Sequence, residues 1–243
     1  MICQTTQRGF ARQGAVALLS LLLALPAAAS VNKSIKIGPG ETANGASSVN
    51  GSVTVGANAV VSGSVDTVNG TIRIEDNARV EDVSTVNGAL RLSAGVSAGD
   101  LDTVNGSIRV ADGCQIDGSV QAVNGSISLA RSTRVSRDIG NVNGSIELTG
   151  AEVGGDLETV NGDVELMDGA ILRGNLIIEK PGGWGWNSKK RKPRIIVGPG
   201  SIVEGTIELE REVELYISDS ARVGGVSGVM SLDDAERFSG ARP

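Results

Sequence analysis

The sequence has no histidine, two cysteines and very few aromatic residues. Without histidine the chain lacks the usual general base, so serine or cysteine triads and hexapeptide-repeat acyltransferase chemistry are not expected. Aromatic residues make up 2% of the 243 residues while 34 are glycine, which argues against an ordinary aromatic-centred core. Stability must therefore come from many small contacts that repeat along the chain.

The first 29 residues are typical of a secretory signal peptide. Arg8 and Arg12 precede an apolar run at 15–26, and Ala27-x-Ala29 provides a cleavage site. The run is too short to be a permanent membrane anchor, and no second long apolar run follows, although an uncleaved anchor remains the alternative. We therefore expect an exported protein, either periplasmic or at the cell surface.

Cleavage would leave Cys114 as the single cysteine of the mature chain. It would also remove two of the 22 basic residues, which leaves 20 against 28 acidic residues and a formal charge of −8. Cys114 falls where Ala59 and Ala78 fall in their own repeats, so it is interpreted as a small buried residue. A thiol that pairs with another chain is the alternative.

The tripeptide Val-Asn-Gly recurs seven times, and each copy follows the previous one by 18 or 19 residues. The copies begin at Val49, Val68, Val86, Val104, Val123, Val142 and Val160. A degenerate unit at 31–48 precedes them, and two divergent units follow a loop at 179–194. A fixed period of this length indicates a solenoid of about ten turns.

Each unit has three apolar stations, which alternate with polar residues as half-buried strands do. Val53 and Val55 show the first station, Val61 the second and Val65 the third. Three short strands per turn predict an all-β fold, a single-stranded parallel β-helix solenoid, with the right-handed form favoured. The extra residue of the 19-residue units falls between the second and third stations, which suits a corner. An antiparallel meander of Asn-Gly hairpins is the alternative.

The chain divides into a signal peptide at 1–29, a β-helix at 30–228 and a C-terminal tail at 229–243. The tail begins with Ser231 and Asp234 in a capping-box spacing and offers Leu232 and Phe238 to one side, so it predicts a short helical cap. The N-terminal end has no comparable element. Self-association is therefore expected through that end, as a closed dimer.

The repeated asparagines are expected to stack inside the coil as a structural ladder. Each amide would donate to one neighbour and accept from the other, while the following glycine takes a positive φ and turns the corner. The members are Asn50, Asn69, Asn87, Asn105, Asn124, Asn143 and Asn161.

Units related to TVNGSI begin at Thr67, Thr103 and Thr159, among others. Over about residues 31–230 these repeats resemble bacterial proteins described as adhesin-like β-strand repeat proteins and polymer-forming, bactofilin-like cytoskeletal proteins. The resemblance implies a β-helix with a structural or adhesive role, here a non-catalytic scaffold of the cell envelope. Bactofilins are mainly cytoplasmic and assemble end to end, and this chain departs from them by its signal peptide.

The sequence offers little catalytic chemistry, and no cofactor, metal or nucleic acid is expected. Carboxylates at Asp66, Asp102 and Glu158 precede Val-Asn-Gly and are reminiscent of a polysaccharide-lyase cleft or a glycosidase pair. A solvated outer face is the favoured interpretation of these residues. A polysaccharide-active enzyme is therefore the third hypothesis for the function.

Two surface features suggest binding. Arg73, Arg91 and Arg109 lie between paired aliphatic residues on successive turns, which predicts a basic stripe for an anionic polymer. The alternative is that nearby carboxylates neutralise the stripe, namely Glu75, Asp76, Asp66 and Asp102.

The second feature is the loop at 179–194, the one interruption of the repeat. It predicts a module that docks on an anionic envelope polymer or membrane, because aromatic rings suit the boundary layer and cations suit the anions. Its candidate binding residues are Trp184, Trp186, Lys189, Lys190, Arg191, Lys192 and Arg194. The alternative is a loop whose tryptophans fold back over the coil.

Overall fold

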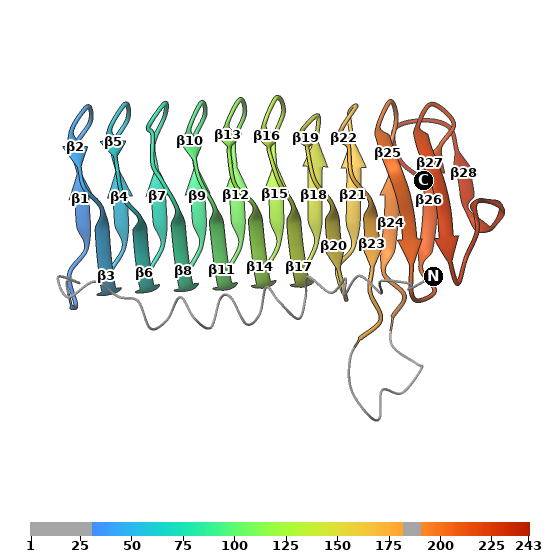
Figure 1. Cartoon of the computed structure of the whole chain (residues 1–243), viewed down its shortest axis with the longest axis horizontal. Coiled ribbons are helices and arrows are strands. Elements are labelled where there is room, and N and C mark those ends of the chain that lie inside the picture. Colours follow the sequence, from blue (N-terminus) through green and yellow to red (C-terminus); the bar gives the residue numbers. More distant parts are fainter. Residues whose placement is uncertain (1–30, 182–190) are drawn as a thin grey trace, which may run out of the picture.

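The computed structural model describes residues 31–181 and 191–243, in which the chain winds through about ten stacked turns. The turns follow one another along a single long axis (Figure 1). Paired strands are parallel, and neighbours in a sheet come from successive turns. The predicted all-β parallel solenoid is therefore confirmed, and the hairpin meander is wrong.

The first apolar station forms one continuous eleven-strand sheet. Its strands, in order, are β1 (Ile35–Ile37), β4 (Val53–Val55), β7 (Ile72–Ile74), β9 (Leu90–Leu92), β12 (Ile108–Val110), β15 (Ile127–Leu129), β18 (Ile146–Thr149), β21 (Val164–Met167), β24 (Arg194–Val197), β26 (Glu214–Ser218) and β28 (Glu236–Phe238).

The second station forms two-residue strands, and the third forms longer ones. The second-station strands are β2 (Thr42–Ala43), β5 (Val60–Val61), β10 (Ser97–Ala98), β13 (Gln115–Ile116), β16 (Arg134–Val135), β19 (Glu152–Val153) and β22 (Ile171–Leu172). The third-station strands are β3 (Ala46–Asn50), β6 (Val65–Asn69), β8 (Val83–Asn87), β11 (Leu101–Asn105), β14 (Val120–Asn124), β17 (Ile139–Asn143), β20 (Leu157–Thr159) and β23 (Leu176–Ile178). Near the C-terminus β25 (Ile202–Leu209) joins the two stations, and β27 (Arg222–Gly228) pairs with it.

The strand register locates the extra residue of the longer units. Ser97 of β10 pairs with Gln115 of β13, a step of 18, whereas Leu101 of β11 pairs with Val120 of β14, a step of 19. The additional residue therefore lies in the corner at 117–119. The predicted corner is confirmed, and the strands on either side keep their faces.

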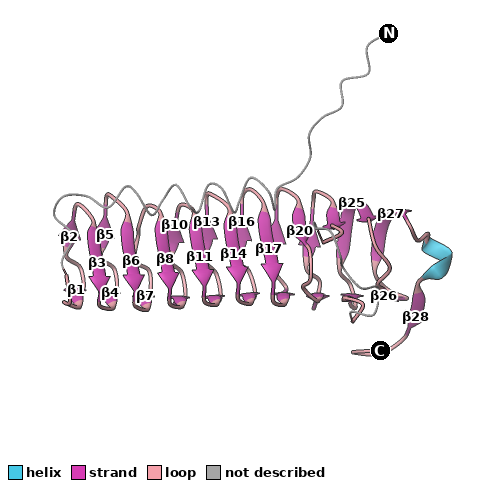
Figure 2. Cartoon of the chain, turned by 90° about the horizontal axis from the view of Figure 1, so that it is seen from below, coloured by secondary structure: helices cyan, strands magenta, loops and turns pink. Residues whose placement is uncertain are grey.

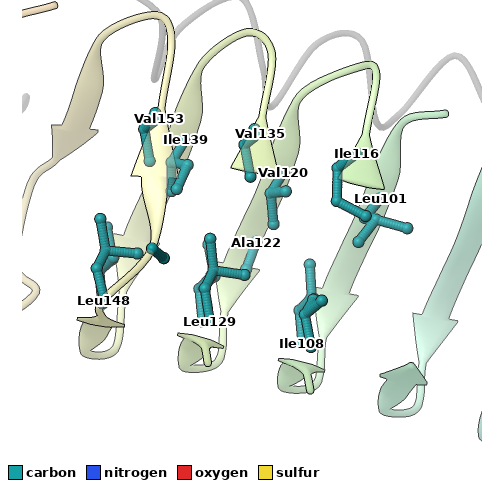
Figure 3. Close-up of a cluster of buried hydrophobic side chains, with 14 of the residues drawn as sticks. Leu101, Ile108, Ile116, Val120, Ala122, Leu129, Val135, Ile139, Leu148 and Val153 are labelled. Carbon is teal, nitrogen blue, oxygen red and sulfur yellow. The ribbon is translucent and has the colours of Figure 1, made fainter. Parts of the chain in front are cut away.

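The core is a column of aliphatic side chains from all three stations. Leu101, Ile108 and Ile116 are fully buried within one turn, and their equivalents stack above and below them (Figure 3). Cys114 lies in the same core, where its Sγ is 3.0 Å from the carbonyl oxygen of Ser93 and burial raises the pKa of the thiol. The interpretation of Cys114 as a small buried residue is confirmed.

The C-terminal tail adds a single 3-10 turn, η1 (Leu232–Asp234), at the far end of the coil (Figure 2). The backbone N–H of Ser231 donates to the carboxylate of Asp234 at 2.8 Å, so the capping spacing has the predicted effect. The predicted contacts are only partly right, because Leu232 is exposed while Met230 and Ala235 pack against the core.

Phe238 lies on a different surface from the end of the core. It is buried on the outer side of the eleven-strand sheet, where it clusters with Met167, Ile196 and Tyr216. Beyond it, Arg242 contacts the carboxylate of Glu165 at 3.2 Å. The tail therefore folds back over the outer face of the last turns instead of only closing the end.

Candidate functional site

The asparagines of the Val-Asn-Gly tripeptides form one hydrogen-bonded row. Nδ2 of Asn105 donates to Oδ1 of Asn87 at 2.9 Å, and the same bond links every successive member. The row extends one residue beyond the expected set, because Asn50 donates to Asn32 at 2.7 Å. The remaining bonds start at Asn69, Asn87, Asn124, Asn143 and Asn161 and measure 2.7–3.0 Å.

The asparagine row lies on the outside of the coil, so the expectation of an internal ladder is wrong. The side chains from Asn50 to Asn143 are exposed, although Thr103, two positions before Asn105, is buried. The strand alternation therefore breaks at this corner, where Thr103 pairs with Ala122 and Asn105 with Asn124 but Val104 has no register partner. At the C-terminal end the row meets Arg211, whose Nη1 donates to Oδ1 of Asn161 at 3.1 Å.

A second row of polar groups lies inside the coil. Oγ1 of buried Thr103 donates to the carbonyl oxygen of Gly88 at 3.2 Å, and Thr85 and Thr67 make the same contact one and two turns earlier, with Gly70 and Gly51. These bonds satisfy carbonyl groups that face the core at a corner. Our sequence reasoning missed this row, although the threonine before Val-Asn-Gly signals it.

The glycines of the tripeptides are required by close approach between turns. A Cβ at Gly106 would lie 1.7 Å from the carbonyl oxygen of Gly88, and one at Gly125 would lie 1.7 Å from that of Gly106. Among these glycines only Gly144 has a positive φ, +133°. The expectation that the glycines turn the corner through positive φ is therefore wrong for the others.

The three arginines of the predicted stripe lie side by side on the outer face of the eleven-strand sheet. Arg73 pairs in register with Arg91, and Arg91 pairs with Arg109, so one strand spacing separates each from the next. All three are exposed. Nη1 of Arg109 donates to Oγ of Ser107 at 2.9 Å.

The nearby carboxylates that were expected to neutralise this stripe do not contact its arginines. Across the described residues, none of the three arginines has a carboxylate within ion-pair distance. Asp66 instead accepts hydrogen bonds from Ser64 and Ser84, and Asp76 accepts one from the backbone of Ala94. The stripe therefore keeps its positive charge at the surface.

The same outward row becomes acidic toward the C-terminus. Arg109 pairs with Ser128, Ser128 with Glu147, and Glu147 with Glu165. Lys36 and Thr54 precede the arginines, and Ile196 and Tyr216 follow the glutamates. One face of the sheet therefore carries positive charge over its first half and negative charge over the next turns.

The loop at 179–194 replaces the Val-Asn-Gly corner between β23 and β24. Its predicted residues Trp184, Trp186, Lys189 and Lys190 lie outside the described residues. The pairs β20/β23 and β21/β24 stay in parallel register on both sides of the insertion. The coil therefore continues past the loop with its faces unchanged.

The described basic residues of the loop contact the coil. Arg191 contacts Asp163 at 2.6 Å, and Lys192 contacts Glu212 at 2.8 Å, where its hydrogen bond lowers the pKa of that carboxyl. Arg194 belongs to strand β24 and lies 4.8 Å from the ring centre of Tyr216. These three cations are therefore engaged within the chain.

Asp66, Asp102 and Glu158, the carboxylates considered as a possible enzyme pair, lie in one outward row, but no two of them are on adjacent strands. Ser84 separates Asp66 from Asp102, and two further strands separate Asp102 from Glu158. Burial, followed by the charges of Asp100 and Asp82, raises the pKa of Asp102 to about 7.

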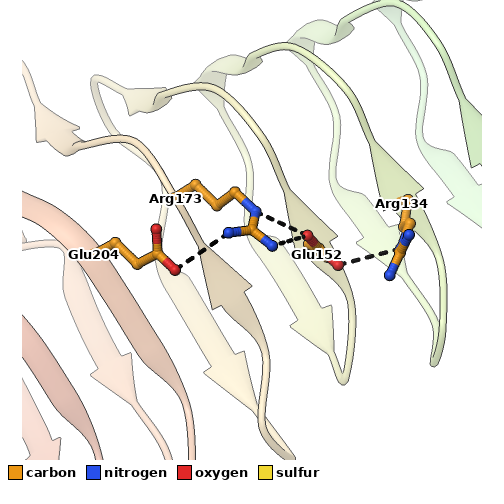
Figure 4. A network of polar contacts seen from close by, with 4 residues as sticks. All are labelled: Arg134, Glu152, Arg173 and Glu204. Atoms are coloured by element: carbon orange, nitrogen blue, oxygen red, sulfur yellow. Dashed lines mark hydrogen bonds and ion pairs between the residues drawn. The ribbon is translucent and has the colours of Figure 1, made fainter.

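A chain of ion pairs crosses the second station. Glu152 lies between Arg134, at 3.2 Å, and Arg173, at 2.6 Å, and Arg173 also contacts Glu204 at 3.4 Å (Figure 4). The hydrogen bond from Arg173 to Glu152 and the charge of Glu152 raise the pKa of the guanidinium. Charges of opposite sign therefore meet on successive turns here, whereas the arginine stripe carries three like charges in sequence.

Residues 31–181 and 191–243 contain no group of three or more acidic or cysteine side chains placed to hold a metal ion, and no helix long and apolar enough to cross a membrane. Comparisons with protein-family models, curated proteins and solved structures found no match to this chain.

Proposed function

We propose that this protein is a non-catalytic, exported structural scaffold of the bacterial cell envelope that acts through its surface. The observation that carries the proposal is the unbroken order of the eleven-strand sheet from β1 to β28. One core column runs through the turns, and hydrogen-bonded rows join them inside and outside. Such a coil is a stiff rod that holds surface side chains at a fixed spacing.

Cell fractionation tests the scaffold proposal. The tagged protein should appear in the periplasmic or envelope fraction, shortened at its N-terminus by cleavage near Ala29. Its loss should change envelope integrity or surface attachment, and the purified protein should not degrade envelope polysaccharides. A full-length cytoplasmic protein, or turnover of a polysaccharide, would contradict the proposal.

A second candidate function is docking on an anionic envelope polymer or membrane through the loop. Its support is the position of the insertion, because the coil keeps its register on both sides and does not need the extra residues. A long loop that a solenoid carries on one side is typical of a binding face.

The loop hypothesis can be tested without disturbing the described ion pairs. A variant with Trp184, Trp186, Lys189 and Lys190 changed to serine leaves Arg191 and Lys192 on their partners. Binding to anionic vesicles should fall steeply in this variant and in high salt. Changing Lys33 and Lys36 to serine removes the same charge at the other end and should leave binding intact. Equal binding by the loop variant and the parent would exclude the loop.

A further inference from the structure

The central outward row of the eleven-strand sheet is charged with opposite sign on the two sides of Ser128. Arg109 and Arg91 lie one and two strands toward the N-terminus, while Glu147 and Glu165 lie one and two strands toward the C-terminus. The row is therefore self-complementary over its central five strands: turned end for end about Ser128, it places Arg109 opposite Glu147 and Arg91 opposite Glu165. Arg73, one strand further out, comes opposite Ile196.

The side chains that surround the centre of this row are short. On β15 the outward neighbours of Ser128 are Ser126 and Ala130, and the equivalent positions of adjacent turns include Ser107 and Ser145. These side chains are short, so Arg109 and Glu147 project furthest from the sheet here. Glu165, by contrast, is flanked by Met167 and partly covered by the C-terminal tail. A second sheet can approach such a face to the usual packing distance of about 10 Å.

The acidic half of the row already holds one arginine. Arg242 of the C-terminal tail lies 3.2 Å from the carboxylate of Glu165. This contact shows that the face accommodates an arginine approaching from outside the sheet. It also makes the tail a competitor for any partner that brings its own arginine to Glu165.

We propose that two copies of this chain pair through this face in antiparallel orientation. Arg109 then lies opposite the partner's Glu147, and Arg91 opposite the partner's Glu165. A parallel pair would place arginine on arginine, so repulsion selects the antiparallel arrangement. The two-fold axis runs along β15, which gives a closed dimer. The inference rests on the proposed scaffold function and names its partner.

The dimer is expected to be weak and sensitive to salt. Five strands at about 4.8 Å form a strip of about 20 Å, which is short for a standard interface of about 800 Å² per partner. Exposed ion pairs contribute little each and are screened by salt. Sedimentation equilibrium of the protein as purified from cells should therefore show dimers at high concentration and low salt, and fewer at high salt.

Charge reversal provides the decisive test. The double variants R91E/R109E and E147R/E165R should each lose self-association by about tenfold or more, because like charges then meet. Mixed in equal amounts, the two variants should form heterodimers, since every facing pair is again of opposite sign. The control R79E/R222E makes the same charge change at exposed arginines of the second station and should associate like the parent. R242S should associate more tightly, because it frees Glu165.

The proposal is overturned by three results. A parent that stays monomeric at high concentration excludes the dimer, and failure of the mixture to associate excludes this face, provided that circular dichroism shows both variants folded. Association that persists in each variant alone indicates contact through the N-terminal end instead. None of these results bears on cellular location, which the fractionation experiment decides separately.

Discussion

A Cβ at Gly106 would lie 1.7 Å from the carbonyl oxygen of Gly88, one turn earlier. No side-chain rotation can relieve such a contact, because both groups belong to the backbone. The turns therefore approach most closely at the Val-Asn-Gly corner, and the repeat spacing depends on glycine there.

Replacing Gly106 by alanine should be among the most damaging single changes in the chain. We expect a loss of about 3 kcal/mol or more in the free energy of unfolding, since the two turns must separate locally. Gly225 is the matched control, because a Cβ there meets no atom within 4 Å and its φ is not positive. Urea denaturation of the two alanine variants decides the point, and equal stability would refute the close-approach argument.

The inner hydroxyl row should respond to a change of nearly equal volume. Thr103→Val keeps the shape but leaves the carbonyl of Gly88 unsatisfied in the core, which should cost about 1 to 3 kcal/mol. Thr103→Ser keeps the donor and should cost less. Thr54→Val on the outer face is the control and should change thermal stability little. A fully stable Thr103→Val variant would show that the buried hydroxyl is not needed.

The outer asparagine row should contribute less than the inner row, because water competes for its amides. Asn105→Ala removes one donor and one acceptor and should cost about 1 kcal/mol. Asn50→Ala should cost a similar amount, since Asn50 also has partners on both sides, Asn32 and Asn69. Asn44→Ala, at an exposed corner position, serves as the reference. A loss no larger than that of the reference would remove the row from the stabilising contacts.

Asp102 should make the protein less stable as pH rises toward neutrality. Its pKa is raised to about 7 in the folded chain, above its value of 3.8 in the unfolded chain, so the folded state binds the proton more tightly. Stability from this group is present below about pH 4 and is lost as pH rises to about 7.

Asp102→Asn should therefore stabilise the protein at pH 8, by on the order of 2 kcal/mol after allowance for solvent screening, and have little effect at pH 4. Asp66→Asn is the control in the same row, where the carboxylate accepts hydrogen bonds from two serines and its loss should not stabilise. Urea denaturation at the two pH values measures both variants. A gain that is independent of pH would refute the assignment.

The sequence was sufficient to predict the architecture because its period and its three apolar stations each have one geometric meaning. The same pattern predicted that the extra residue of the longer units lies in a corner, since an insertion within a strand would reverse the faces of that strand. The side of the coil on which Asn105 lies was predicted wrongly, because hydrogen bonding between stacked amides is possible on either side. Strand alternation could not have decided it, because alternation places Asn105 on the same side as buried Thr103, and the chain departs from that pattern at Val104.

The arginine stripe was visible in the sequence, but its partners were not. Asp66 and Asp76 are close to Arg73 in sequence, yet neither forms an ion pair with it. Hydrogen bonds from Ser64 and Ser84 hold Asp66, and the backbone N–H of Ala94 holds Asp76. The contact between Arg242 and Glu165 joins residues that are 77 positions apart in the sequence, and no sequence pattern predicts it. Such contacts depend on where the last turns place the tail, which composition and spacing do not determine.

The outer asparagine row also has a direction. Every Nδ2 points to the preceding turn and every Oδ1 to the following one, so the amide dipoles from Asn32 to Asn161 add head to tail. The carbonyl end is partially negative, and the guanidinium of Arg211 occupies it, as cations occupy the C-terminal ends of α-helices. The opposite end, at Asn32, presents an amide donor with partial positive charge. A coil of this kind is thus electrically polarised along its axis even where its side chains carry no formal charge.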